Sequence, residues 1–230
     1  MIYRVKSYYT LLINCLFYIN KLQKKGPYLK YLIYVALAFI LWFVMFVVKP
    51  FNFWLMMAFS TSLLSVISYI NYKVQFKKEY FNFTEIAIGI GSALLLYGIF
   101  WFGKSVLDSI GIIPNHNQNI SSVYANKGIV PGWAVAMLLF FPIGFGEEFF
   151  WRGYLQRHLT GKYGKWAALG ITVFFYTAVH IPTLNPILLI ASFLVGIYWG
   201  LIFLWRGNIV AAVISHMIWD PLIFIIAPLN

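Results

Sequence analysis

Apolar runs of roughly membrane-spanning length recur along this chain of 230 residues. A helix needs about 20 predominantly apolar residues to cross a bilayer, and a chain in lipid must satisfy its backbone hydrogen bonds internally. The runs therefore predict an all-α fold, a polytopic transmembrane helical bundle of seven to eight spans. The expected spans cover residues 31–48, 53–70, 86–102, 132–155, 166–180, 187–205 and 209–228, with a bend near Pro221 in the last.

Basic residues are distributed unevenly among the loops. With the amino terminus inside, fourteen of the seventeen Lys and Arg residues fall on the cytoplasmic side, as is typical of membrane proteins. Residues 1–30 carry six of them around the short apolar piece 8–20, which predicts a cytoplasmic or interfacial segment, or a marginal eighth span. Residues 31–230 are the predicted transmembrane domain. We expect a multi-pass protein of the cell membrane with a cytoplasmic amino terminus.

The composition argues against two other kinds of protein. A net charge of +11 would indicate nucleic-acid binding in a soluble protein. Here 62% of the residues are hydrophobic and only 10% are charged, so we expect the lipid bilayer as partner and no nucleic acid. Cys15 is the single cysteine, so neither an intrachain disulfide nor a cysteine metal cluster can form.

Five ionisable residues lie inside the predicted apolar spans. They comprise three of the six acidic residues and two of the four histidines: Glu147, Glu148, Asp220, His180 and His216. A charge at the centre of a transmembrane helix costs roughly 2.5–3.5 kcal/mol on insertion scales. Several such residues on three spans favour one shared functional site, to which we add Arg152.

The turn near residues 162–163 relates the depths of two of these residues. Glu147 lies about 16 residues before the turn and His180 about 17 after it, so both sit about 25 Å from it in an antiparallel helical pair. The sequence thus predicts that Glu147 and His180 can face each other across neighbouring helices.

A spacing of four residues predicts two side-chain pairs. Glu148 and Arg152 share one helix face, and His216 and Asp220 share another. Glu147 is turned by about 100° from Glu148, so the two glutamates cannot both point at Arg152. We expect Glu148 and Arg152 to form a structural ion pair, which leaves Glu147 free for chemistry.

A carboxylate with two histidines can activate water in two ways. It can bind a divalent metal such as zinc, with Glu147, His180 and His216 as candidate ligands, or it can work without metal, with Glu147 as general base. The zinc-protease pattern HExxH is absent, as is a serine in a recognisable nucleophile elbow. Ion pathways use the same residue types, so hydrolysis and transport both stay open at this point.

Three ordered motifs carry a family resemblance. They are EExxxRG at residues 147–153, YxxxH at residues 176–180 and HxxxD at residues 216–220. This pattern resembles the CPBP (Abi) family of intramembrane proteases, which is related to the Ras-converting CAAX endopeptidase. The resemblance covers about residues 132–220, the expected protease core. Two positions depart from the family pattern, because Tyr176 stands where Phe is usual and Asp220 where Asn is frequent.

The resemblance implies an intramembrane endopeptidase that cleaves a peptide or membrane-protein substrate. By that resemblance the catalytic residues would be Glu147, His180, His216 and Asp220, while Glu148 and Arg152 would hold the site together. Glu147 would be the base, His180 would help to activate water, and the other two would stabilise the oxyanion or ligate metal. Family members are described both as metalloproteases and as metal-free glutamate proteases.

The resemblance also implies a helical bundle with a conical cavity open to the cytoplasm and to lipid. Bacterial members are linked to bacteriocin immunity and to the processing of secreted peptides. A non-catalytic bacteriocin-immunity or sensor-binding scaffold of the same fold is therefore the alternative function, and a small transporter is the third.

Overall fold

The structure of the chain is a computed structural model that describes residues 30–72, 77–128 and 130–229. Every regular element among these residues is a helix, which confirms the predicted all-α class. The predicted amino-terminal segment and the predicted extra span at residues 8–20 lie outside the described residues. The chain divides into two compact units, residues 1–40 and 41–230, which are described separately.

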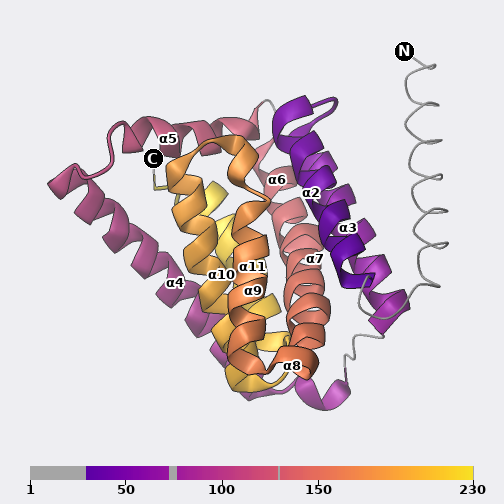
Figure 1. The fold of residues 1–230 in the computed structure, drawn as a ribbon. Helices are drawn as coiled ribbons and strands as arrows, with labels where there is room; N and C mark the ends of the chain where they lie inside the picture. Colours follow the sequence, from indigo (N-terminus) through magenta and orange to yellow (C-terminus); the bar gives the residue numbers. More distant parts are fainter. Residues whose placement is uncertain (1–29, 73–76, 129, 230) are drawn as a thin grey trace. The chain divides into compact units, whose positions relative to one another are not determined.

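The helices of the described residues follow one another with short turns between them (Figure 1). In the first unit the described residues, 30–40, form the beginning of α2, which ends in the second unit. The α-helices are α2 Lys30–Phe43, α3 Phe53–Tyr72, α4 Phe83–Ile110, α5 His116–Tyr124, α6 Gly132–Leu138, α7 Phe145–Glu148, α8 Arg157–Tyr163, α9 Lys165–Ala178, α10 Pro186–Arg206 and α11 Val210–Pro221. Wider π-helical turns are η2 Val44–Val48, η5 Leu139–Gly144, η6 Phe149–Gln156 and η8 Leu222–Ile226, and short 3₁₀ turns are η3 Lys78–Tyr80, η4 Ala125–Lys127 and η7 Ile181–Thr183.

Among the residues that the structure describes, six helical stretches are long and apolar enough to cross a membrane. They are Tyr31–Val48, Phe53–Ile70, Phe83–Ile110, Gly132–Tyr163, Lys165–Thr183 and Pro186–Arg206. The seventh predicted span corresponds to the shorter apolar helix Val210–Ile226, in which α11 ends at Pro221 and gives way to η8. These helices and their composition make the chain a multi-pass membrane protein.

Two spans are longer than the sequence predicted. The third runs over Phe83–Ile110, because Asn82 caps its start and Gly111, in the left-handed region at φ 64°, ends it. Lys104 and Asp108 lie inside this helix as a pair four residues apart, with Nζ 2.7 Å from Oδ2. The fourth runs to Tyr163, since Gly164 at φ 82° is the first residue that leaves the helix.

Residues 104–131, which lie between the third and fourth predicted spans, are largely helical. Besides the end of α4 they contain α5, which begins at His116. Nε2 of His116 lies 2.8 Å from Oδ1 of Asp108 near the end of α4. An amphipathic helix of this kind lacks the apolar length of a span, which is why the sequence pattern did not reveal it.

In the second unit, α11 packs against α4, α10 and η5, while α9 packs against both α8 and α10. The segments of the fourth span approach their neighbours closely at two glycines. A Cβ atom on Gly144 would lie 3.1 Å from Cα of Met217 in α11, and one on Gly146 would lie 2.9 Å from Cβ of Thr61 in α3. Glycine therefore allows the segment just before Glu147 to sit against two helices at once.

The backbone of the fourth span is irregular directly before the acidic motif. Phe141 has extended φ and ψ values of −152° and 126°, and Pro142 follows it within η5. Proline lacks the backbone N–H that a regular helix needs, so Pro142 is compatible with this irregular segment. Non-helical backbone at membrane depth is tolerated where it is buried in protein or lines a cavity.

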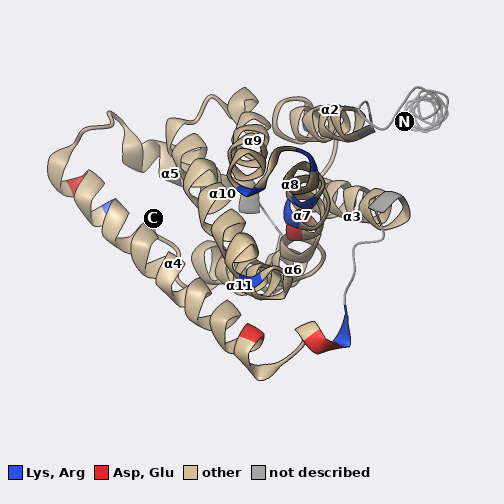
Figure 2. Cartoon of the chain, turned by 60° about the horizontal axis from the view of Figure 1, so that its bottom comes forward, with Lys and Arg blue, Asp and Glu red and all other residues tan. Residues whose placement is uncertain are grey.

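Charged residues are sparse along the helices (Figure 2). In the larger unit, Arg157 and Lys162 lie in α8, Lys165 begins α9, and Arg206 ends α10. We refer to the turns at residues 161–165 and 206–209 as the basic turns. They lie at the same end of the antiparallel helices α9, α10 and α11.

Candidate functional site

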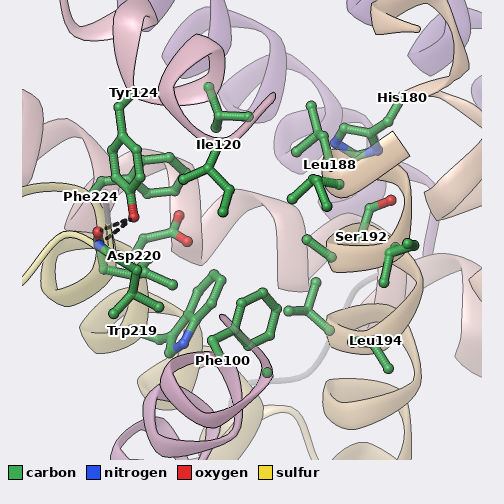
Figure 3. Close-up of a pocket in the computed structure, with 18 of the residues that line it drawn as sticks. Phe100, Ile120, Tyr124, His180, Leu188, Ser192, Leu194, Trp219, Asp220 and Phe224 are labelled. Carbon is green, nitrogen blue, oxygen red and sulfur yellow. Dashed lines mark hydrogen bonds between the residues drawn. The ribbon is translucent and has the colours of Figure 1, made fainter. Parts of the chain in front are cut away.

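A cavity of about 410 Å³ lies within the second unit (Figure 3). Aromatic and aliphatic side chains form most of its wall, among them Phe100, Leu188, Trp199 and Phe224. Four of the ionisable residues predicted from the sequence also line it: Glu147, His180, His216 and Asp220. Figure 3 shows His180 and Asp220 on opposite sides of the cavity. An apolar pocket with a few convergent polar groups is the usual form of a ligand or active site.

Glu147 is held by one neutral group. It lies on α7, its side chain is buried, and the hydroxyl of Tyr176 donates to its Oε2 over 2.9 Å. No Lys or Arg among the described residues forms an ion pair with it. The carboxylate therefore faces the cavity without a permanent countercharge, as the prediction of a separate role for Glu147 required.

His180 lies two residues after the end of α9 and is buried beside Tyr176. Its Nδ1 lies 2.8 Å from the backbone oxygen of Tyr176, to which only an N–H can donate. This bond assigns the proton to Nδ1 and leaves the lone pair on Nε2, which accepts from Nε1 of Trp42 over 3.4 Å. The structure thus brings His180 and Glu147 to the same tyrosine, as their equal distances from the turn predicted.

Behind Glu147, four charged or ionisable side chains form a continuous chain of bonds. Nη1 of Arg152 donates to Oε1 of Glu148 over 2.7 Å, and Nδ1 of His216 lies 2.9 Å from that same oxygen. Nε2 of His216 then lies 3.3 Å from Oδ2 of Asp220. Both pairs predicted from the spacing of four residues are present, and the bond between Glu148 and His216 joins them into one network.

Arg152 connects this network to α10. Its Nη2 donates to the backbone oxygen of Gly196 over 2.9 Å. Its guanidinium carbon lies 4.9 Å from the ring centroid of Tyr176 and 5.7 Å from that of Trp199. Trp199 in turn stacks on His216 with ring centroids 3.7 Å apart. The arginine is thus enclosed by aromatic faces, which stabilise a buried cation.

The network is not fully satisfied. Oε2 of Glu148 and Nε of Arg152 are buried and have no hydrogen-bond partner among the described residues. Unpartnered buried polar atoms cost free energy, and a buried ion pair is seldom more stabilising than a well-packed apolar pair of the same volume. Stability alone therefore explains the presence of these buried charged residues poorly, and a function at the adjacent cavity explains it better.

The predicted zinc set of Glu147, His180 and His216 does not form a metal cage in this arrangement. The described residues contain no group of three His, Cys, Asp or Glu side chains placed to hold a metal ion. Both nitrogens of His216 face carboxylate oxygens, so neither directs a lone pair at the cavity while those carboxylates are ionised. The zinc set stays a prediction, and no step proposed below passes through a metal.

Three aromatic residues at the site were not assigned roles by the sequence reasoning. Tyr176 was noted as a motif position, but its hydroxyl bond to Glu147 was not foreseen. Trp42 and Trp199 contact the two histidines, and tryptophans are so frequent here, nine in the chain, that nothing in the sequence distinguishes these two. Only the departure of Tyr176 from the usual Phe of the resembled family was a usable signal.

The comparisons with known proteins bear on this same region. Residues 129–222 match a family model described as type II CAAX prenyl endopeptidase Rce1-like. No curated protein and no solved structure matches the chain. The matched residues contain all three sequence motifs and the whole charged network described above. Residues 129–222 are therefore similar to the CAAX-type endopeptidase family, the family that the motifs of the sequence resemble.

Proposed function

We propose that this protein is an intramembrane endopeptidase that hydrolyses a peptide bond with water activated by Glu147 and His180. The observation that carries the proposal is the contrast between neighbours in the acidic motif. Glu148 is bound to Arg152 and His216, whereas Glu147 faces the cavity with only the Tyr176 hydroxyl on it. A general base needs such a carboxylate within reach of a water molecule and of the substrate.

The residues suggest how the reaction would proceed. Glu147 would take a proton from water while the water oxygen forms a bond to the scissile carbonyl carbon. Nε2 of His180 would give up the bond that it accepts from Trp42, accept the second hydrogen bond of that water instead, and so orient the water. When the carbon–nitrogen bond breaks, Glu147 would return its proton to the departing amine, so that the base is regenerated.

His216 and Asp220 occupy another part of the cavity wall. With Glu148 and Asp220 both ionised, both ring nitrogens of His216 are N–H donors and the ring is positively charged. A positive ring at the cavity would stabilise the negative oxygen of the tetrahedral intermediate. Glu148 and Arg152 would fix the ring in this position. The fourteen basic residues expected inside also support a cytoplasmic amino terminus.

The test is a mass-spectrometric inventory of peptides from cells that carry the native chain or Glu147→Gln at equal membrane abundance. Glutamine keeps the shape of the side chain but cannot take a proton, so specific products should disappear and a precursor should accumulate. Mutations of this kind commonly lower the rate by about 10²–10⁴-fold.

Glu79→Gln is the matched control, because Glu79 is exposed in the short turn η3 and lies outside the cavity. It should leave the inventory unchanged. Identical inventories for the native chain and Glu147→Gln would instead support the non-catalytic scaffold, provided that both proteins remain folded in the membrane.

A further inference from the structure

The ring of His216 has a partner at each of its two nitrogens. Nδ1 lies 2.9 Å from Oε1 of Glu148, and Nε2 lies 3.3 Å from Oδ2 of Asp220. Two such bonds fix the line that joins the two nitrogens, but they oppose a tilt of the ring about that line only weakly. A third contact is therefore needed to fix the plane of the ring, and with it the approach of the ring to the cavity.

Trp199 supplies this third contact. Its indole stacks on the His216 imidazole, with ring centroids 3.7 Å apart and an angle of 16° between the planes. Trp199 is 0% exposed and lines the cavity together with His216. A parallel ring at van der Waals distance blocks the tilt toward its side. The negative face of the indole also attracts a positive ring, which is the form of His216 in the proposed reaction.

Helix α11 holds the indole of Trp199 in turn. Nε1 of Trp199 donates over 3.1 Å to Oγ of Ser215, the residue directly before His216. Trp219, on the same helix, packs edge-on against the indole, with ring centroids 5.7 Å apart and planes at 79°. The N–H of the indole is thus bound to Ser215, and its face is the part that meets His216.

Two bonds along α10 set the direction in which Trp199 points. Arg152 donates to the backbone oxygen of Gly196 over 2.9 Å, and Gln156 donates to that of Gly200 over 3.0 Å. A Cβ atom on Gly200 would lie 3.2 Å from Oε1 of Gln156, so this side of α10 faces η6. Trp199 is turned by about 100° from Gly200 and therefore points to another neighbour, α11.

We propose that Trp199 is a positioning residue for His216 and that it acts through the flat face of its indole. It holds the ring at the cavity wall, where the positive charge of the ring stabilises the negative oxygen of the tetrahedral intermediate. None of the three sequence motifs contains Trp199, so the inference adds a residue of α10 to the site. It rests on the proposed endopeptidase function.

Two substitutions separate the face of the indole from its N–H. Trp199→Phe keeps a flat aromatic face but has no N–H, whereas Trp199→Leu has neither. Trp166→Leu is the control, because Trp166 on α9 is 72% exposed and does not line the cavity. Thermal unfolding in detergent and membrane abundance identify any variant that fails to fold, and Trp199→Met then takes the place of a leucine variant that does.

The first measurement is kinetic and uses a substrate identified by the peptide inventory. Trp199→Leu should lower kcat roughly tenfold, which is less than the about 10²–10³-fold cost of removing an oxyanion donor outright. Trp199→Phe should restore kcat to near the native value. KM should change little in either variant, because a group that acts on the intermediate contributes to kcat. Trp166→Leu should leave both constants unchanged.

The second measurement needs no substrate. In nuclear magnetic resonance spectra of protein with labelled histidine, the ring current of the indole should shift the signals of the His216 ring. These signals are identified by their loss in His216→Gln. The shift should persist in Trp199→Phe, which keeps an aromatic face, and disappear in Trp199→Leu.

The results separate this inference from the proposed function. If Trp199→Phe loses as much kcat as Trp199→Leu, or if Trp199→Leu keeps the native kcat or the native His216 shift, the face of the indole does not position His216. Cleavage that depends on Glu147 would still support the endopeptidase in each of these cases. If no product depends on Glu147, the proposed function fails, and the ring-current shift alone decides whether Trp199 holds His216.

Discussion

Two glutamate–arginine pairs hold helices to α10, and they differ in their surroundings. Arg206 at the end of α10 pairs with Glu85 in the first turn of α4, and there the arginine side chain is 24% exposed. Arg152 and Glu148 meet in the interior, where both side chains are 0% exposed. The first pair has no further ionisable partner among the described residues, whereas the second continues through His216 to Asp220.

This difference in surroundings shows how the depth of an ion pair in the membrane changes the partners that it needs. At the end of a helix, water or lipid headgroups can complete the hydration of a charged group. In the interior only the protein can do so, so Arg152 takes a backbone oxygen of α10 and Glu148 takes a second donor, His216. An ion pair in the interior therefore needs further polar partners from the protein. Two residues of this network, His216 and Asp220, also line the cavity.

Removal of the interior arginine should have the largest effect on stability. Arg152→Met leaves Glu148 buried with one partner fewer, which should lower the free energy of unfolding by about 3–5 kcal/mol. Arg206→Met should lower it by less, because the arginine side chain lies partly in water, which screens its charge. Thermal unfolding in detergent and membrane abundance measure both. Equal losses would show that depth does not distinguish the two pairs.

A smaller effect, on the rate of cleavage, is expected at Tyr176, which contacts both Arg152 of the charged network and Glu147 at the cavity. Tyr176→Phe removes the hydroxyl that donates to Glu147 but keeps the ring under Arg152 and the backbone oxygen that binds His180. Loss of one hydrogen bond to a charged group, about 1.5 kcal/mol, should lower kcat roughly tenfold with little change in KM. The substrate identified by the peptide inventory provides the assay.

Tyr97→Phe is the control for this change. Tyr97 also donates its hydroxyl over 3.0 Å, but to the backbone oxygen of Ala227 and not to Glu147. It should leave kcat unchanged. A tenfold loss of kcat in both variants, or in neither, would show that the Tyr176 hydroxyl does not position Glu147.

The smallest expected effect comes from metal removal. Because both nitrogens of His216 are bound to carboxylates, chelation of divalent metal should leave the rate of peptide cleavage within about twofold of its starting value. The measurement is the cleavage rate of purified protein before and after treatment with a chelator, together with its zinc content. Loss of activity that zinc restores would instead support the zinc set predicted from the sequence.

The sequence was sufficient for the two side-chain pairs at the site that form within a single helix. Glu148 and Arg152, like His216 and Asp220, are four residues apart, and helix geometry alone puts such residues on one face. The depth of Glu147 relative to His180 also followed, because two antiparallel helices share one turn. These inferences needed only the helical repeat and the position of the breaks.

The contacts between helices could not be predicted in the same way. The bond from His216 to Glu148 depends on how α11 is rotated toward α7, which close packing at Gly144 and Gly146 decides. The length of α4 was also missed, because Lys104 and Asp108 look like loop residues until they are seen to pair within a helix. Packing and local pairing therefore account for what the hydrophobic pattern left out.

Two hydrogen bonds between η6 and α10 restrict where residues can be inserted or deleted in related chains. Arg152 donates to the oxygen of Gly196, and Gln156, four residues later, donates over 3.0 Å to the oxygen of Gly200, also four residues later. A slip of one helical turn, about 5.4 Å, would put Arg152 opposite Gly200 and leave Gln156 without a glycine partner. Insertions and deletions in relatives should therefore be confined to the turns, because one inside either segment would break at least one of these bonds.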